Sequence, residues 1–334
     1  MTECVAGSIA SPASDAMARA AIGKRWTARS VPDLAGRRVV ITGATRGLGR
    51  ATALALASKG ASLVLPVRSP AAGYAVAEEI RREHGVDVTV GHLDLADLPT
   101  VRSFVDELDG PVDVLINNAG RMWGPRMTTV DGFEAQLGTN YLGHFALTGL
   151  LLPTLLAGPA PRVVSLSSVF HRFGTFAFDD MHFTRGYAQN AAYARSKLAT
   201  LVFARELARR ATTAGVALRS YAAHPGYSAT DLQTDGVEGV TRLTMRLGNA
   251  LLATSAEEGA WPTVCAATLP ELPNGTFVGP SKLGGYRGTP GVAASSRLSR
   301  DEAVARELWE FSERETGVRP STLLAVRVAR MRSS

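Results

Sequence analysis

Tyr193 and Lys197 are the two side chains whose types and spacing best suit proton transfer. They stand four residues apart in a segment with helical periodicity, so they share one face of a helix. A tyrosine with a pKa near its usual value of about 10 is a poor acid or base at neutral pH. Because a neighbouring ammonium favours the phenolate, we expect Lys197 to lower the pKa of Tyr193. Surface pairs share this spacing, so the pair indicates a site only together with other groups.

Further polar residues follow the strands that we expect beside this helix. Ser167 and Ser168 end one strand, residues 117–120 (Asn-Asn-Ala-Gly) end the strand before it, and Asn140 lies in a helix between the two. The carboxyl ends of parallel strands meet at one edge of a sheet, where α/β folds bind ligands. The sequence therefore predicts that these groups gather at one rim.

A glycine-rich loop joins the first apolar strand to the first helix. Gly43 permits a tight turn, Gly47 lets the backbone approach a pyrophosphate, and Gly49 lets the helix pack on the sheet. The free N–H groups of such a helix start attract phosphate. The loop therefore predicts a dinucleotide site that includes Gly43, Thr45, Arg46, Gly47, Leu48 and Gly49.

The end of the second strand indicates which dinucleotide binds. NAD sites usually carry a carboxylate there, whereas this strand ends in Pro66, Val67 and Arg68. Arg46 and Arg68 suit a 2′-phosphate, because a guanidinium can bind phosphate through two hydrogen bonds. We therefore expect NADP(H) rather than NAD(H), although two solvated loop arginines would look the same in the sequence.

Short apolar runs alternate with segments of helical periodicity along most of the chain. This alternation predicts an α/β fold, a single Rossmann-type doubly wound parallel sheet with helices on both faces. The expected strands are residues 38–42, 61–67, 86–93, 112–117, 162–167 and 217–223, with 277–278 as a last short strand. The expected helices are 49–59, 70–84, 98–108, 131–156, 192–213 and 301–316.

No linker divides the chain into two domains. We expect residues 1–25 to be a disordered extension and residues 26–320 to be one dinucleotide-binding domain. Within that domain, about 226–290 would form a substrate lid, with 280–290 an irregular loop, and 321–334 would be a basic tail.

The composition is that of an ordinary globular protein. Of 334 residues, 46% are hydrophobic and 20% are charged, and the net charge of +6 is spread over the chain. The spread favours a solvated basic surface over a nucleic-acid interface, for which no recognition module is apparent. Cys4 and Cys265 stand far apart and no metal-ligand spacing occurs, so we expect neither a disulfide scaffold nor a metal. The lack of a long apolar run or secretory signal predicts a cytoplasmic location.

Taken together, the motifs resemble the short-chain dehydrogenase/reductase family. They are the Thr-Gly-x3-Gly-x-Gly loop, Asn-Asn-Ala-Gly, a serine, Tyr-x3-Lys and a following Pro-Gly, and they cover roughly residues 31–316. Residues 93–95, 131–134, 140–145 and 224–226, with the long insert between Ser168 and Tyr193, resemble the retinol dehydrogenase branch.

The resemblance implies a role for each matching residue. Tyr193 would exchange a proton with the carbonyl oxygen, Ser168 rather than Ser167 would hydrogen-bond that oxygen, and Lys197 would hold the nicotinamide ribose. Asn140 would anchor a water in a proton relay through Lys197. The remaining cofactor contacts would come from Asp94 and Leu95 at the adenine, Asn118 near the adenosine ribose, and Pro225, Gly226 and Thr230 at the nicotinamide.

These roles imply an NADPH-dependent carbonyl reductase or alcohol dehydrogenase with an apolar, bulky substrate. The aromatic residues of the 169–188 insert would line a substrate cleft or simply pack against the body. Relatives often pair through the helices placed here at 131–156 and 192–213, so a homo-oligomer and a monomer both stay open. A non-catalytic protein that senses NADP(H) is the alternative, although such proteins typically lose the tyrosine or the lysine, and both are present.

Overall fold

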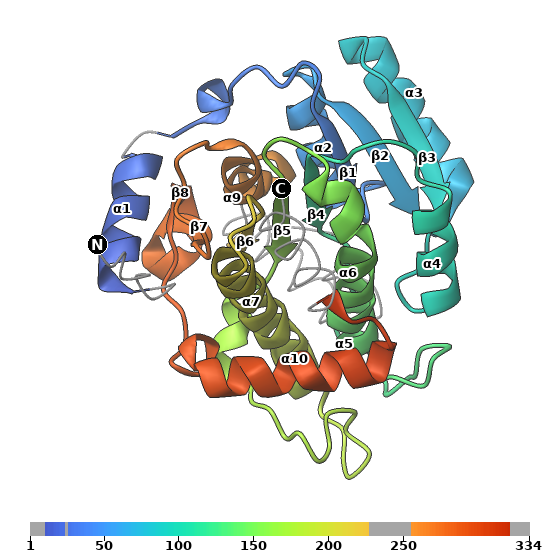
Figure 1. Ribbon diagram of the computed structural model, residues 1–334, viewed down its shortest axis with the longest axis vertical. Helices are drawn as coiled ribbons and strands as arrows, with labels where there is room; N and C mark the ends of the chain where they lie inside the picture. Colours follow the sequence, from blue (N-terminus) through green and yellow to red (C-terminus); the bar gives the residue numbers. More distant parts are fainter. Residues whose placement is uncertain (1–10, 24–25, 227–254, 321–334) are drawn as a thin grey trace, which may run out of the picture.

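The chain forms one mostly parallel sheet, described in a computed structural model over residues 11–23, 26–226 and 255–320 (Figure 1). The strand order is β3-β2-β1-β4-β5-β6-β7-β8, and only β8 runs antiparallel to its neighbour. The strands are β1 Arg38–Ile41, β2 Ser62–Val67, β3 Val88–His92, β4 Val114–Asn117, β5 Arg162–Leu166, β6 Arg219–Ala223, β7 Phe277–Lys282 and β8 Arg287–Val292. The chain reverses its direction of winding between β1 and β4, where doubly wound sheets bind their ligands. The predicted fold class is confirmed.

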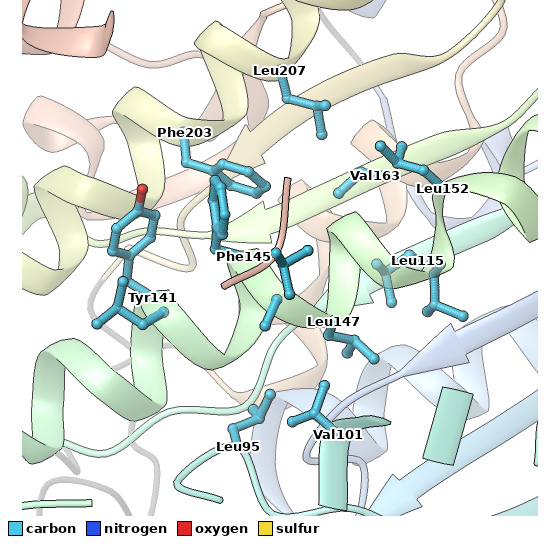
Figure 2. Close-up of a cluster of buried hydrophobic side chains, with 14 of the residues drawn as sticks. Leu95, Val101, Leu115, Tyr141, Phe145, Leu147, Leu152, Val163, Phe203 and Leu207 are labelled. Carbon is cyan, nitrogen blue, oxygen red and sulfur yellow. The ribbon is translucent and has the colours of Figure 1, made fainter. Parts of the chain in front are cut away.

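Helices cover both faces of the sheet. Side chains alternate between the two faces along each strand, so neighbouring residues belong to different hydrophobic clusters. Val40 belongs to one hydrophobic cluster, and its neighbours Val39 and Ile41 belong to the other. The first cluster, part of which Figure 2 shows, joins the sheet to α4 Leu98–Asp106, α6 Gly143–Leu156, α7 Gln189–Thr213 and α10 Glu302–Thr316. The second joins it to α1 Pro12–Ile22, α2 Gly47–Ala57, α3 Pro70–His84 and α9 Ala256–Thr268.

Local signals set the helix boundaries. Pro70 stands in the first turn of α3, where its missing N–H is not needed, and Gly85 ends the helix with a left-handed φ of 65°. Asp301 caps α10 by accepting hydrogen bonds from the N–H groups of Ala303 and Val304. Both helices fall where the periodicity predicts them, give or take one residue. Within the residues described, no helix combines the length and the apolar character needed to cross a bilayer.

The predicted disorder of residues 1–25 is wrong for residues 12–22, which form α1. Ser11 caps this helix, and Ala18 and Ile22 are buried in the second cluster. Asp15 also pairs with Arg300 at 3.4 Å. The segment looked like a flexible extension because its residues are small, but small residues let a helix pack closely beside β8.

The predicted lid over residues 226–290 is wrong for the part that the structure describes. Residues 256–268 form α9, and 277–292 contain β7, the short turn η5 Leu283–Gly285 and β8. The expected irregular loop at 280–290 is therefore mostly a hairpin at the edge of the sheet, and its many glycines and prolines concealed the strand pattern. Residues 227–254 and the tail 321–334 lie outside the described residues.

The predicted helix over residues 131–156 is interrupted. Residues 131–134 form a turn, followed by α5 Ala135–Leu137, a wide π-helical turn η2 Gly138–Leu142, and α6. Isolated π-turns often mark functional sites, and Asn140 lies in this one.

Helix α10 lies across α6 and α7 on the outside of the molecule (Figure 1). Its Trp309 packs with ring centroids 5.2 Å from Phe145 and 5.9 Å from Phe203. Its Ser312 hydroxyl lies 2.5 Å from the Tyr141 hydroxyl. Relatives often pair through these two helices, which are covered here by the chain's own helix.

We predict that Trp309→Ala lowers the free energy of unfolding by about 3–5 kcal/mol, because the change leaves a large cavity among aromatic rings. Urea denaturation measures the loss. The control is Glu310→Ala, an exposed position on the same helix, which should change stability by less than about 0.5 kcal/mol. Equal effects of the two variants would contradict the packing role of α10.

Candidate active site

The glycine loop is built for close approach. Gly43 has a left-handed φ of 67°, and a Cβ placed on it would lie 2.9 Å from the Ala119 Cα. A Cβ on Gly49 would lie only 2.2 Å from the Gly43 carbonyl oxygen. Helix α2 begins at Gly47 without a side-chain cap at Arg46, so its first N–H groups face the loop. This cradle, with Thr45 and Leu48 half-buried in it, fits a dinucleotide pyrophosphate.

Thr42 ties this loop to the end of β4. Its hydroxyl accepts hydrogen bonds of 2.9 Å from the backbone N–H groups of Asn118 and Ala119. The Asn118 amide in turn donates to the Thr42 and Gly43 carbonyls, at 2.8 and 3.2 Å. We expected Asn118 beside the adenosine ribose. The structure shows its side chain bracing the glycine loop.

Asn140 holds the segment that follows the Asn-Asn-Ala-Gly motif. Its side chain accepts from the Arg121 N–H at 2.7 Å and donates to the Arg121 carbonyl and the Ser196 hydroxyl, both at 2.9 Å. Its Oδ1 and the Lys197 Nζ both lie against Gly120, where an added Cβ would be 3.1 Å from the oxygen and 3.6 Å from the nitrogen. Asn140 and Lys197 are therefore brought together next to the end of β4.

Ser168 and Tyr193 meet at the end of β5. The Ser168 side chain lies close enough to the Tyr193 phenol to lower its pKa, and the Phe170 ring lies 5.6 Å from the tyrosine ring. Ser167 points elsewhere, because its hydroxyl donates to the Lys197 carbonyl at 2.7 Å. The choice of Ser168 over Ser167 thus agrees with the geometry.

The expected effect of Lys197 on Tyr193 is not found. Burial raises the pKa of Tyr193 to about 12, and the opposing influence comes from the Ser168 hydroxyl. Burial also lowers the pKa of Lys197 to about 8. The Lys197 Nζ donates to the Leu166 carbonyl at 2.9 Å and lies 5.8 Å from the centre of the tyrosine ring. At this distance, desolvation outweighs the attraction between ammonium and phenolate.

The expected adenine end is only partly assembled. Arg46 and Arg68 are both exposed. Arg46 comes just before the start of α2 and Arg68 just after the end of β2, and both places lie at the same edge of the sheet. Asp94 accepts a hydrogen bond from the Ala96 N–H at 2.9 Å and is half-buried. The Leu95 side chain belongs to the first hydrophobic cluster, so the expected contact of this residue with the adenine would be made by its backbone.

Pro225 and Gly226 follow β6 at the same rim. Gly226 donates from its N–H to His224 Nδ1 at 3.2 Å, and a Cβ on it would lie 2.4 Å from the Tyr286 carbonyl oxygen. The remaining expected contact, Thr230, lies outside the described residues.

The 169–188 insert contributes little to the site beyond Phe170. Phe176 and Phe178 pack against the first cluster, and Phe183 lies against the Arg195 guanidinium, 3.8 Å from ring centroid to Cζ. Phe173 is 73% exposed. His182 connects the Glu134 N–H to the Glu315 carboxylate of α10, which is a structural role. Over the residues that the structure describes, no cluster of acidic, histidine or cysteine side chains is arranged for a metal ion.

The buried histidines predict a loss of stability in weak acid. Burial lowers the pKa of His144 and His171 to about 4 and that of His224 to about 3. Between about pH 6.5 and pH 4 the unfolded chain therefore binds protons that the folded chain refuses, so stability falls as pH falls. Each histidine contributes at most about 1.4 kcal/mol per pH unit.

Urea denaturation at a series of pH values measures this slope. His171→Gln should flatten it, whereas His92→Gln, a change at an exposed position, should leave it unaltered. A free energy of unfolding that stays constant from pH 6.5 to 4.5 would contradict the analysis.

Comparison with known proteins agrees with this geometry. The family model described as short chain dehydrogenase matches residues 37–240. Human retinol dehydrogenase 13 is 41% identical over 291 residues, which make up 85% of each chain. Mouse polyprenol dehydrogenase is 40% identical over 295 residues, or 86% of each chain. The crystal structure of an uncharacterized protein from Mycobacterium paratuberculosis matches 88% of this chain and 98% of its own, with a TM-score of 0.74 and 45% identity.

The family match spans more than half of the chain, and the relatives span most of it. The predicted resemblance is thereby confirmed: this chain belongs to the short-chain dehydrogenase family, an oxidoreductase family that uses nicotinamide cofactors, and to its retinol dehydrogenase-like branch.

Proposed function

We propose that this protein is an NADP(H)-dependent oxidoreductase that interconverts a bulky apolar carbonyl compound and its alcohol. The observation that carries the proposal is the approach of the Ser168 side chain to the Tyr193 phenol at the end of β5, on the same rim as the glycine loop. Two hydroxyls that converge there are suited to bind one substrate oxygen.

Tyr193 is the proposed acid and base. A bound nicotinamide cofactor supplies or accepts the hydride. During reduction Tyr193 donates its proton to the carbonyl oxygen, while Ser168 donates a hydrogen bond to the same oxygen; in oxidation the phenolate takes the proton back. A pKa of about 12 keeps the phenol protonated at neutral pH, and this favours the reductive direction.

Lys197 and Asn140 support the proton transfer. With a pKa of about 8, Lys197 is mainly an ammonium at pH 7 and donates hydrogen bonds, first to the Leu166 carbonyl and in the complex to the cofactor ribose. A water held beside the Asn140 Oδ1 and the Lys197 Nζ would continue the relay outward. The position of both groups next to Gly120 supports this assignment.

The substrate is proposed to be apolar for two reasons. Phe170 forms an aromatic wall directly beside the Tyr193 ring. The relatives are named for retinol and polyprenol, both long isoprenoid alcohols. A polar sugar-like substrate would instead need several hydrogen-bonding side chains at this wall.

We predict that Tyr193→Phe lowers kcat for reduction by about 10²–10⁴-fold, because the variant lacks the proton that Tyr193 would donate. Its affinity for NADPH should stay within twofold of the wild type. The readout is NADPH oxidation with all-trans-retinal, decanal and menadione, together with a fluorescence titration of NADPH. Tyr74→Phe, on the exposed side of α3, is the matched control and should keep full activity.

Two outcomes would count against the proposal. Turnover that survives Tyr193→Phe undiminished would remove the assignment of the acid. Tight NADPH binding by the wild-type protein, with no turnover on any aldehyde, ketone or quinone tested, would favour the alternative of a non-catalytic NADP(H) sensor.

The cofactor preference has its own test. Replacing Arg46 and Arg68 together by glutamine should weaken NADPH binding by about 10–100-fold, because charge-assisted hydrogen bonds to the 2′-phosphate would be lost. Binding of NADH, which lacks that phosphate, should be unchanged. The control is Arg82→Gln, which removes an exposed cation on α3, away from Arg46 and Arg68. Equal losses of affinity for NADPH and NADH would show that the two arginines do not bind the 2′-phosphate.

A further inference from the structure

A second cavity lies at the edge of the sheet opposite the glycine loop. It has a volume of about 420 Å³. It is bordered by the first residues of β1, β4, β5 and β6 or the segments directly before them, and by the end of α9. Since these strands are parallel, their amino ends lie a full strand length away from the rim that holds Ser168 and Tyr193. The cavity is therefore separate from the candidate active site.

Three guanidinium groups border this cavity, from Arg37, Arg162 and Arg219. Arg162 and Arg219 begin neighbouring strands and are paired in register. Burial lowers the pKa of Arg162, and the charges of Arg219 and Arg37 lower it further. Arg162 is thus close enough to both Arg219 and Arg37 to be repelled by them.

Neither of the two carboxylates in the described lining pairs with Arg162 or Arg219 in the ion pairs of the structure. Asp113 accepts from Arg37 Nη1 at 2.7 Å and also from the Arg38 N–H at 2.9 Å. The other carboxylate in the described part of the lining is Asp33. It is exposed and accepts a hydrogen bond from the Ala35 N–H at 3.0 Å. The charge of the lining therefore remains positive around Arg162 and Arg219.

Capping of α9 explains part of this arrangement. Arg162 Nη1 donates to the Leu269 carbonyl at 2.8 Å, and Arg219 Nη1 donates to the Pro270 carbonyl at 3.0 Å, just beyond the last turn of the helix. These acceptors are neutral, so they leave both positive charges in place. The capping role also does not explain why there is a cavity between the start of β5 and β6 and the segment before β1.

Apart from Thr268, the remaining side chains of the described lining are apolar. Its deepest side chains are Leu34, Val39, Leu56 and Val114, all buried in the second cluster or against it. The volume falls within the usual range for ligand sites, about 300–1,000 Å³. A pocket with cations at its mouth and a hydrophobic floor suits a molecule that has one anionic end and a compact apolar body.

We propose that this cavity is a second binding site, which takes a small organic anion with its carboxylate or phosphate group at Arg162 and Arg219 and its apolar body on the Leu34–Val39 floor. The site does not depend on the oxidoreductase chemistry. Because such a ligand binds the folded chain and not the unfolded one, it raises the melting temperature, and the rise grows with the logarithm of its concentration above the Kd.

Calorimetric titration with benzoate and benzyl phosphate tests the proposal, with benzyl alcohol as the uncharged control. We expect submillimolar binding of at least one of the two anions and none of the alcohol. A preference for benzoate or for benzyl phosphate then identifies the natural headgroup as a carboxylate or a phosphate.

Two variants locate the binding. Arg219→Gln should weaken it at least tenfold. Ala217→Asp, at an exposed lining position, should do the same by adding a negative charge without removing any contact. The exposed Arg82→Gln should bind like the wild type. Melting temperatures measured without ligand check that each variant is folded. If Arg219→Gln does not fold, Ala217→Asp tests the proposal in its place.

The glycine loop is the competing site for a phosphate. The proposal is overturned if neither anion binds, if Arg219→Gln and Ala217→Asp both bind like the wild type, or if only the Arg46→Gln/Arg68→Gln variant loses binding. Crystals soaked with 4-bromobenzyl phosphate give an independent check. We expect the anomalous bromine peak between Arg162 and Leu34, and a peak only at the glycine loop would contradict the proposal.

Discussion

The Thr42 hydroxyl is the point on which the arrangement of the rim depends. It accepts two backbone hydrogen bonds from the end of β4 and lies 2.9 Å from His144 Nε2, while His144 Nδ1 lies 3.1 Å from the Asn140 carbonyl. This chain of contacts joins the glycine loop, the Asn-Asn-Ala-Gly motif and the π-turn of η2. All of it is buried or nearly so, where an unpaired polar group costs about 1–3 kcal/mol, so the network fixes the spacing between the phosphate cradle and the side chains that would carry the proton.

Burial has opposite effects on the two titratable groups of the site. It raises the pKa of Tyr193 and lowers that of Lys197, because in each case it disfavours the charged form. The result is a neutral phenol beside an amine that titrates not far above neutral pH. Among the residues that the structure describes, Ser168 is the neighbour that stabilises the phenolate, so the hydroxyl pair, rather than the Tyr–Lys spacing, sets the pKa of the tyrosine.

The molecule uses its two sheet edges and its outer helix layer differently. The carboxyl edge gathers hydroxyl, amide and ammonium groups from separate strands and helices. The amino edge gathers arginines that begin β5 and β6, together with Arg37 just before β1. Helix α10 closes the outer face of α6 and α7 through Trp309, so a surface on which two copies could pack is filled from within the same chain.

The sequence by itself was sufficient for the order of the strands from β1 to β6, for most of the helices between them and for the tight turn of the glycine loop. These features depend on local causes: period-two and period-3.6 patterns, glycine at close approaches, and Pro70 and Gly85 at helix ends. The sequence did not reveal α1, the β7–β8 hairpin or the π-turn, because small residues in the first and the glycines and prolines of the second hide the patterns, and contacts with distant elements add to the local signals. Only the tertiary structure decided that Leu95 belongs to the core and that Asn118 braces the loop. The direction in which the pKa of Tyr193 moves was also decided there, because desolvation depends on everything packed around the phenol and not on its neighbour four residues away.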